Sequence, residues 1–584
     1  MRRMLVVLVF SILTSAPVGA EDWTYCNIGI GAQGERNYDL AIKYYTLCLN
    51  EGDLSRGSQV KVFNERGIVY RKIGAFDSAI ADFDRALRLD SAYANAYVNR
   101  GNTYSDKGAN DQAIADYTQA LRLDPDYAIA YNNRGDVYID MGEFERAISD
   151  FTQALRLNSS MAFAYNGRGD AYRGTGENEL AIADYSQSLR LDPDNALTYF
   201  GRAAAYKDGG DPDRAIVDYT ESLRLDPTDA AAFNNRGTAY AEKEDYDRAI
   251  EDYDRALDLD PDYFGPYINR GNSFGERGDH DRAIADYTEA LRLDPSFAAA
   301  YYIRGNAFSS KGDYDRAIED YDQTLHLDPN YFAVYGDRGQ AHRAMGNYDS
   351  AVADYTQYLQ RNPDHAWAYI ARAVANGAKG DNHRAIADYT EGLRLDPSFD
   401  GAYAGRANAY SDTGDYDRAI ADFTEALRLD PAFNSARKSR GWAYFYIGRF
   451  GQSVSDFRRT VEIEPENAYW AIWLYLTQAR DGREGQAELR DNAVRLILSD
   501  WPGPVVRMFL GEVDVQAVLD MAQSDQTVAD KERRAEAYFY AGQYQLLAGH
   551  EDKAVALFRE VIKTGVTNFI EYTGAKAELS RLEQ

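Results

Sequence analysis

The charged residues with the most regular spacing in this 584-residue chain are an arginine and an aspartate that lie sixteen residues apart. Arg236 and Asp252 form one such pair, and Arg304 and Asp320 form another. A guanidinium and a carboxylate can join through two parallel N–H donors, so each pair could be an ion pair. Alternatively, the arginines could line a ligand groove. A charge inside an apolar face is costly without a partner, which favours the pair.

The arginine recurs every thirty-four residues without an insertion, and this step organises the chain. The series is Arg66, Arg100, Arg134, Arg168, Arg202, Arg236, Arg270, Arg304, Arg338, Arg372, Arg406 and Arg440. A fixed period of this length, with each unit divided into two helical patterns, is typical of a helical solenoid.

Each unit predicts a hairpin of two antiparallel helices. Within residues 229–262, small and aromatic residues follow helical spacing on a first helix and again on a second. They are Phe233, Gly237 and Tyr240, then Ala249, Tyr253 and Ala256. In most units a glycine eight residues after the arginine predicts the end of the first helix, and a proline predicts the end of the second. The arginine and aspartate then stand at the same height, which predicts a buried or half-buried ion pair between the two helices.

The order aromatic, Gly or Ala, Tyr, Ala, aromatic and Pro resembles the tetratricopeptide repeat family over about residues 22–466. The resemblance implies an all-α fold, a right-handed superhelical solenoid of helix-turn-helix repeats. It also implies a concave wall that is lined by first helices and usually holds an extended peptide or a partner helix. The arginine departs from the family, which usually has an aliphatic residue at that position.

Polar residues two before and two after each arginine lie four apart, so they share one face of the first helix. We expect this face to form the concave wall. The candidate partner-binding residues are Asn102, Asn132, Asp136, Asn166, Asp170, Asn234, Asn272 and Asn306. Amides both donate and accept, so a ladder of them could hold the backbone of an extended peptide. The alternative is that they are ordinary solvated helix residues.

The N-terminal residues predict export. In residues 1–20, Arg2 and Arg3 precede a short apolar run and a small-residue cleavage site, which is typical of a signal peptide. No other run reaches membrane length. We therefore expect an exported protein without an integral membrane span, in a bacterial periplasm. Cys26 and Cys48 lie at similar heights in a degenerate first repeat at 21–59, which favours a disulfide over free thiols in an exported chain.

The repeat is lost after twelve regular units at 60–466. Residues 467–584 predict an irregular helical region with one further repeat-like hairpin and a closing helix. Capping of the last apolar face explains such a region. The segments WLYL, PVVRMFLGE, FYAGQYQLLAGHEDKAVALF and TNFIEYTGAKAEL are also similar to the gram-negative lipoprotein called new lipoprotein I. That resemblance implies an envelope adaptor that holds murein hydrolases and a tail-specific periplasmic protease.

The composition disfavours nucleic acid and anionic lipid as partners, because the net charge of −29 has no compensating basic patch. No catalytic nucleophile motif, H-E-x-x-H or phosphate loop occurs. We therefore expect no catalytic residue, no metal site, no cofactor and no enzyme activity. The sequence predicts an exported scaffold or adaptor that binds peptides or proteins along its groove and could organise envelope hydrolases or proteases. The alternative is a structural component of a secretion or outer-membrane assembly complex.

Overall fold

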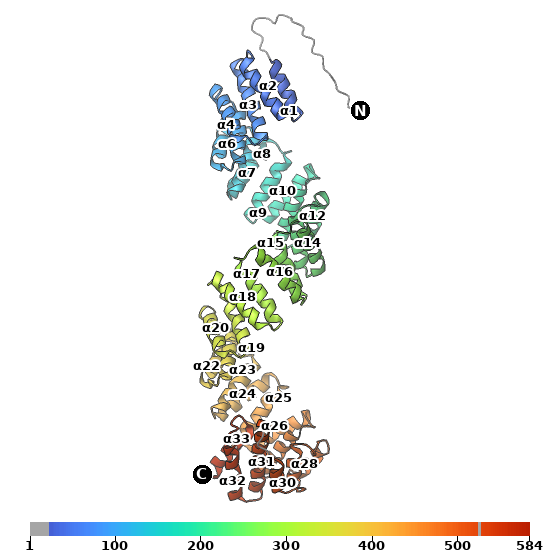
Figure 1. Ribbon diagram of the computed structural model, residues 1–584, viewed down its shortest axis with the longest axis vertical. Helices are drawn as coiled ribbons and strands as arrows, with labels where there is room; N and C mark the ends of the chain where they lie inside the picture. The colour runs from blue at the N-terminus through green and yellow to red at the C-terminus, as the bar shows by residue number, and fades with distance from the viewer. Residues whose placement is uncertain (1–22, 524–526, 584) are drawn as a thin grey trace. The chain divides into compact units, whose positions relative to one another are not determined.

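The computed structural model describes residues 23–523 and 527–583, so the predicted signal peptide at 1–20 lies outside the described residues. Every regular element among the described residues is an α-helix. The chain divides into two compact units, Met1–Pro295 and Ser296–Gln584. Figure 1 shows the labelled helices coloured along the chain. This division falls inside the regular repeats, so both units contain the same hairpin. Among the described residues, no helix combines the length and apolar composition that a membrane crossing requires.

Helices of the first unit alternate between the first and second members of successive hairpins. They are α1 (Thr24–Gly34), α2 (Tyr38–Glu51), α3 (Arg56–Lys72), α4 (Phe76–Leu89), α5 (Ala94–Asp106), α6 (Asn110–Leu123), α7 (Ala128–Asp140), α8 (Phe144–Leu157), α9 (Ala162–Gly174), α10 (Asn178–Leu191), α11 (Ala196–Asp208), α12 (Pro212–Leu225), α13 (Ala230–Glu242), α14 (Tyr246–Leu259), α15 (Phe264–Glu276) and α16 (His280–Leu293).

The second unit continues the alternation and ends in irregular helices. Its hairpin helices are α17 (Ala298–Ser310), α18 (Tyr314–Leu327), α19 (Ala333–Ala344), α20 (Tyr348–Arg361), α21 (Ala366–Ala378), α22 (Asn382–Leu395), α23 (Asp400–Asp412), α24 (Tyr416–Leu429), α25 (Asn434–Tyr446) and α26 (Phe450–Ile463). The remaining helices are α27 (Ala468–Arg480), α28 (Gln486–Ala493), α29 (Gly503–Phe509), α30 (Val515–Met521), α31 (Val528–Leu547), α32 (Glu551–Lys563) and α33 (Ile570–Leu582).

An aromatic ring of the second helix packs against a glycine of the first in the repeated hairpin. The side chain of Tyr253 is fully buried, and a Cβ atom placed on Gly237 would lie 2.7 Å from its Cε1 atom. Such a distance is too short for two carbon atoms, so a larger residue at position 237 would push the Tyr253 ring away. The buried Ala249 and Ala256 flank the ring on α14. The small residues in the sequence pattern therefore make room for the ring.

The turn between the two helices uses a left-handed residue. Gly278 has a φ of 76°, and glycines occupy the corresponding position in most other hairpins. In the hairpin of α13 and α14, Glu244 takes this conformation with a φ of 60°. A side chain there is strained, because Cβ approaches the following carbonyl oxygen.

The C-terminal region has a core of its own, built around Trp473. This fully buried indole contacts the rings of Phe457, Phe539 and Tyr540. Helix α29 begins at Gly503, the repeat-like hairpin is α31 and α32, and the closing helix is α33. The short helices α28 and α30 were not expected from the pattern. Helix α33 packs on α31 and α32 and also on α25, the first helix of the last regular repeat.

Candidate protein-binding wall

A bidentate ion pair joins the two helices of each regular hairpin and fixes their register. Arg236 donates from Nε to Asp252 Oδ2 at 2.8 Å and from Nη2 to Oδ1 at 2.7 Å. Asp252 is 5% exposed and the Arg236 side chain is half-buried. The same two bonds join Arg304 to Asp320 and recur in all twelve regular hairpins. Each of these arginines therefore binds the aspartate of its own hairpin.

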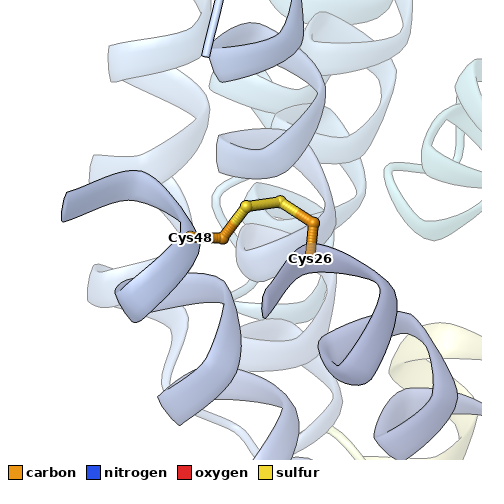
Figure 2. Close-up of a disulfide and its surroundings, with 2 residues drawn as sticks. All are labelled: Cys26 and Cys48. Atoms are coloured by element: carbon orange, nitrogen blue, oxygen red, sulfur yellow. A yellow bond between two sulfur atoms is a disulfide. The ribbon is translucent and has the colours of Figure 1, made fainter. Parts of the chain in front are cut away.

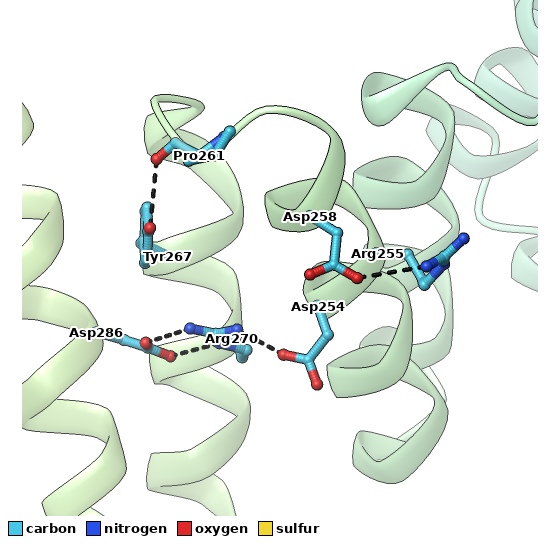
Figure 3. Close-up of polar contacts among 7 residues, drawn as sticks. All are labelled: Asp254, Arg255, Asp258, Pro261, Tyr267, Arg270 and Asp286. Atoms are coloured by element: carbon cyan, nitrogen blue, oxygen red, sulfur yellow. Dashed lines mark hydrogen bonds and ion pairs between the residues drawn. The ribbon is translucent and has the colours of Figure 1, made fainter.

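The remaining Nη1 group of the arginine reaches the preceding hairpin. Arg270 donates to Asp254 at 2.5 Å, and Figure 3 shows its guanidinium lying between Asp286 and Asp254. In other repeats a hydroxyl replaces the second carboxylate, as where Arg134 donates to Thr118 at 2.9 Å. Each guanidinium of this kind therefore ties two neighbouring hairpins together. The sequence carried the signal for this contact, because the position sixteen before Arg100 and each later arginine is always Thr, Ser or Asp.

The second carboxylate changes the local electrostatics. Burial opposes a charge on Arg270, but hydrogen bonds and attraction from Asp286 and Asp254 outweigh it and raise the pKa of Arg270. Burial also raises the pKa of Asp286, against the opposing effect of Arg270 and with a further increase from Asp254. The guanidinium consequently stays charged across the physiological range.

The residues two before and two after each arginine, here called the first-helix wall, differ in exposure. The earlier members Asn132 and Asn234 are only 4% and 7% exposed, and Asn166 is half-buried. Asn234 Oδ1 accepts a hydrogen bond from Asn269 on α15 at 3.0 Å. Asn234 therefore connects one repeat to the next, whereas Asn132 and Asn166 donate to Asp136 and Asp170 of their own helices.

The later members of the first-helix wall are more open. Asp136 and Asn272 are exposed, and Asn102, Asp170 and Asn306 are half-buried. Four of them accept a hydrogen bond from the tyrosine hydroxyl of their own second helix. These pairs are Asn102 with Tyr117, Asp170 with Tyr185, Asn272 with Tyr287, and Asn306 with Tyr321, at 2.6–2.8 Å. The later amides are thus held in place by the hairpin while their helix face stays accessible.

Asp136 has an unusual environment on this wall. The residue is exposed, and its Oδ2 atom accepts a hydrogen bond from Asn132 at 2.9 Å. Desolvation, followed by the charges of Asp140 and then Asp170, raises the pKa of Asp136 to about 7, while the bond from Asn132 opposes the shift. A cationic side chain placed beside Asp136 would reverse this increase.

A cleft of about 1120 Å³ lies at the C-terminal end of the wall in the second unit. Helices α23 and α25 form one side, with Asn408 and Trp442 two residues after their arginines. Helix α33 forms the other side with Tyr572 and Lys576. The Tyr446 hydroxyl donates to the carbonyl of Ile570 at 3.0 Å and holds the two sides together. Aromatic and polar groups meet in this cleft, a lining that suits a polypeptide segment.

The two cysteines are joined at the start of the solenoid. Cys26 on α1 and Cys48 on α2 form a disulfide with a Cα to Cα distance of 5.3 Å, and both are fully buried (Figure 2). The bond links the two helices of the degenerate first hairpin. It connects the outermost helix to the rest of the unit.

Family models of the tetratricopeptide repeat match this chain over most of its regular hairpins. The matched residues are 67–108, 101–142, 128–161, 169–210, 196–229, 230–263, 268–332, 305–376 and 401–433. The chain belongs to the tetratricopeptide repeat family. The matched models describe this repeat and indicate no enzyme family.

Solved tetratricopeptide structures include several similar chains. MamA is 31% identical, with 28% of this chain and 94% of MamA covered and a TM-score of 0.27. YrrB, titled a TPR protein with an unusual peptide-binding site, is 22% identical, with 32% and 97% covered and a TM-score of 0.29. Yeast Tom70 is 18% identical, with 74% and 97% covered and a TM-score of 0.28.

Proposed function

We propose that this tetratricopeptide protein is a non-enzymatic scaffold that binds peptides or proteins along its first-helix wall. The observation that supports this proposal best is the accessible face two residues after eleven of the twelve arginines, Ala204 being the buried exception. Hairpin contacts hold its amides at Asn102, Asn272 and Asn306, so a partner would meet polar groups that are already ordered. Preordered groups lose less conformational entropy on binding than mobile ones.

The wall suits a polypeptide better than a small molecule because its binding groups recur along the solenoid. An extended peptide offers backbone donors and acceptors at a regular spacing, which a row of amides can match. The cleft beside α33 adds Trp442 and Tyr572 at one end, and large aromatic side chains dominate the energetics of protein interfaces.

Partner capture with matched variants tests this function. The mature chain is used as bait in chemical crosslinking, beside a variant with Asn272→Arg and Asn306→Arg on the wall. The control is Glu251→Arg, a substitution of an exposed residue on the second helix α14. We expect partners that are lost with the wall variant and retained with the control. Equal capture by all three proteins would contradict wall binding.

Export to a bacterial periplasm forms part of the proposal. It is supported by the signal-like residues 1–20 and by the buried disulfide, because disulfides persist in oxidising compartments. Fusion of these residues to alkaline phosphatase tests export directly, since that enzyme is active only outside the cytoplasm. We expect activity that is lost when Leu8→Arg interrupts the apolar run.

We further propose that the partners include cell-envelope hydrolases or proteases. The resemblance to new lipoprotein I of the segments between Trp473 and Leu579 supports this choice, and these segments lie on α27, α29, α31, α32 and α33. Captured proteins identified by mass spectrometry separate the outcomes. Murein hydrolases or proteases would support the proposal, whereas subunits of a secretion or outer-membrane assembly complex would replace it with the structural alternative.

A further inference from the structure

The first regular repeat differs from the other eleven in the charges of two residues near the end of its second helix. At nineteen and twenty-two residues after the arginine, six repeats have opposite charges three residues apart that form ion pairs, such as Glu289 with Arg292. Five repeats have a neutral residue at one or both positions. Only the first of the twelve has two cations there, Arg85 and Arg88. Like charges at this spacing repel each other.

The same repeat is where the solenoid opens into a cleft. Arg85, Arg88 and Arg66 line a cleft of about 490 Å³ together with Asn50, Gln59 and Phe63. Within the described residues, neither Arg85 nor Arg88 belongs to an ion pair, although the Arg85 guanidinium lies 5.9 Å from the centre of the Phe63 ring. Arg66 differs, because Asp82 occupies two of its donors.

An added helical turn accounts for the cleft. Helix α3 has 17 residues where α5 has 13, and the extra residues lie at its N-terminal end. The added turn brings Gln59 to the cleft, and Arg56 on the same turn donates to the carbonyl of Leu89 at 2.7 Å. The two neighbouring cations and the added helical turn therefore occur in the same repeat.

We propose that this cleft binds an oxyanion, a carboxylate or phosphate group of a small ligand, between Arg85 and Arg88. Guanidinium groups match both oxyanions through paired N–H donors. A bound anion would remove the repulsion between the two arginines, and the amides of Asn50 and Gln59 could donate to its outer oxygens. The cleft volume falls within the range of small-molecule sites. This site is separate from the first-helix wall and does not depend on its function.

Calorimetric titration of the mature chain with inorganic phosphate and with citrate tests the site. The buffer contains neither anion and about 20 mM salt, because screening weakens exposed charges. We expect saturable binding, with affinity lowered by about tenfold or more in the double variant Arg85→Gln and Arg88→Gln. Arg85→Glu should cause the same loss, because it recreates the Glu–Arg pair of other repeats. Arg122→Gln, at the Arg88 position of the next repeat, is the matched control and should leave affinity unchanged.

The outcomes separate the ligand sources and the proposal itself. Tighter binding of citrate identifies carboxylates as the preferred group, and tighter binding of phosphate identifies phosphate groups. Equal binding of both supports a general oxyanion site. The proposal is overturned if neither anion binds saturably, if Arg85→Glu retains affinity, or if Arg122→Gln lowers affinity as much as the double variant does. Unchanged melting temperatures show that the variants remain folded.

Discussion

The regular hairpins and the Glu571 site of the C-terminal region bury acidic side chains in different ways. In the hairpins each buried aspartate faces an arginine, and the same geometry repeats along the chain. In the C-terminal region, Glu571 is buried among aromatic residues and accepts a hydrogen bond from the Tyr540 hydroxyl at 2.8 Å. Nearby Glu536 accepts from Trp501 and Tyr469. The first arrangement pairs charge to fix register, whereas the second keeps an acidic group in a setting that disfavours its charge.

Breaking the repeated ion pair should have the largest effect on stability. Asp252→Ala leaves the Arg236 charge half-buried without its carboxylate, so we expect a loss of roughly 3–5 kcal/mol in the free energy of unfolding of this hairpin. Hydrogen exchange of α13 and α14 amides measures it. Adding Arg236→Leu should restore part of the loss, because the pair is then replaced by apolar groups. Full additivity of the two single effects would contradict the pairing.

The matched control for this change lies on the same helix. Asp247 pairs with Arg277 at the surface, where both groups are exposed. We expect Asp247→Ala to change stability by less than about 1 kcal/mol, because exposed ion pairs contribute little.

Removing the disulfide should act on the first hairpin alone. Cys26 and Cys48 are 22 residues apart, and cross-linking a loop of this length stabilises a folded protein by about 3 kcal/mol in the chain-entropy description. The double variant Cys26→Ser and Cys48→Ser should therefore expose α1 and α2 to limited proteolysis. Cleavage that begins instead in α13 or α14 would contradict this local role.

The C-terminal region should respond to pH in the neutral range. Burial, followed by the charge of Glu536, raises the pKa of Glu571 to about 8, while the bond from Tyr540 opposes the shift. The folded state therefore binds the Glu571 proton more tightly than the unfolded state, whose carboxyl has its ordinary pKa. This contribution to stability is present below the unfolded pKa and is lost as pH rises toward 8.

The variant Glu571→Gln keeps the neutral form at every pH. Between pH 5 and 7 we expect the parent C-terminal region to lose about 2 kcal/mol more than the variant does. Chemical denaturation followed by tryptophan fluorescence measures the difference, because Trp473 lies in this core. Parallel pH profiles for the two proteins would show that Glu571 is not the responsible group.

The strained turn should give the smallest effect. Glu244 occupies a left-handed conformation that glycine adopts without strain. We expect Glu244→Gly to stabilise the hairpin of α13 and α14 by about 1 kcal/mol or less, since the added freedom of the unfolded chain offsets part of the gain. Thermal unfolding compares this variant with Glu242→Gly at the last residue of α13, where the backbone is right-handed and glycine relieves no strain, so that variant should not be stabilised.

Periodic contacts could be predicted from the sequence, whereas contacts between neighbouring repeats could not. The pairing of Arg236 with Asp252 follows from spacing within one hairpin, and the glycine turn follows from the same pattern. The burial of Asn132 and Asn234 depends on how closely successive first helices approach, which periodicity does not determine. The same applies to the bond from Arg270 to Asp254, although an acceptor at that position was visible in each repeat.

Less of the C-terminal region could be predicted from the sequence. Its hairpin was predicted because it keeps the repeat pattern, but α28 and α30 are short helices without it. The cleft beside α33 results from packing of α33 on α25, a contact between residues far apart in the chain. Likewise, the pair Arg85 and Arg88 was visible in the sequence, but the added turn of α3 that places them at a cleft was not.

Site-specific photo-crosslinking in cells tests the central claim, that the first-helix wall contacts another polypeptide. A photoreactive amino acid replaces Asn272 on the wall of α15 in one strain and the exposed Glu251 on α14 in another. The account predicts a discrete crosslinked protein adduct from position 272 and none from position 251. Adducts from position 251 alone, or no adduct from position 272, would contradict it.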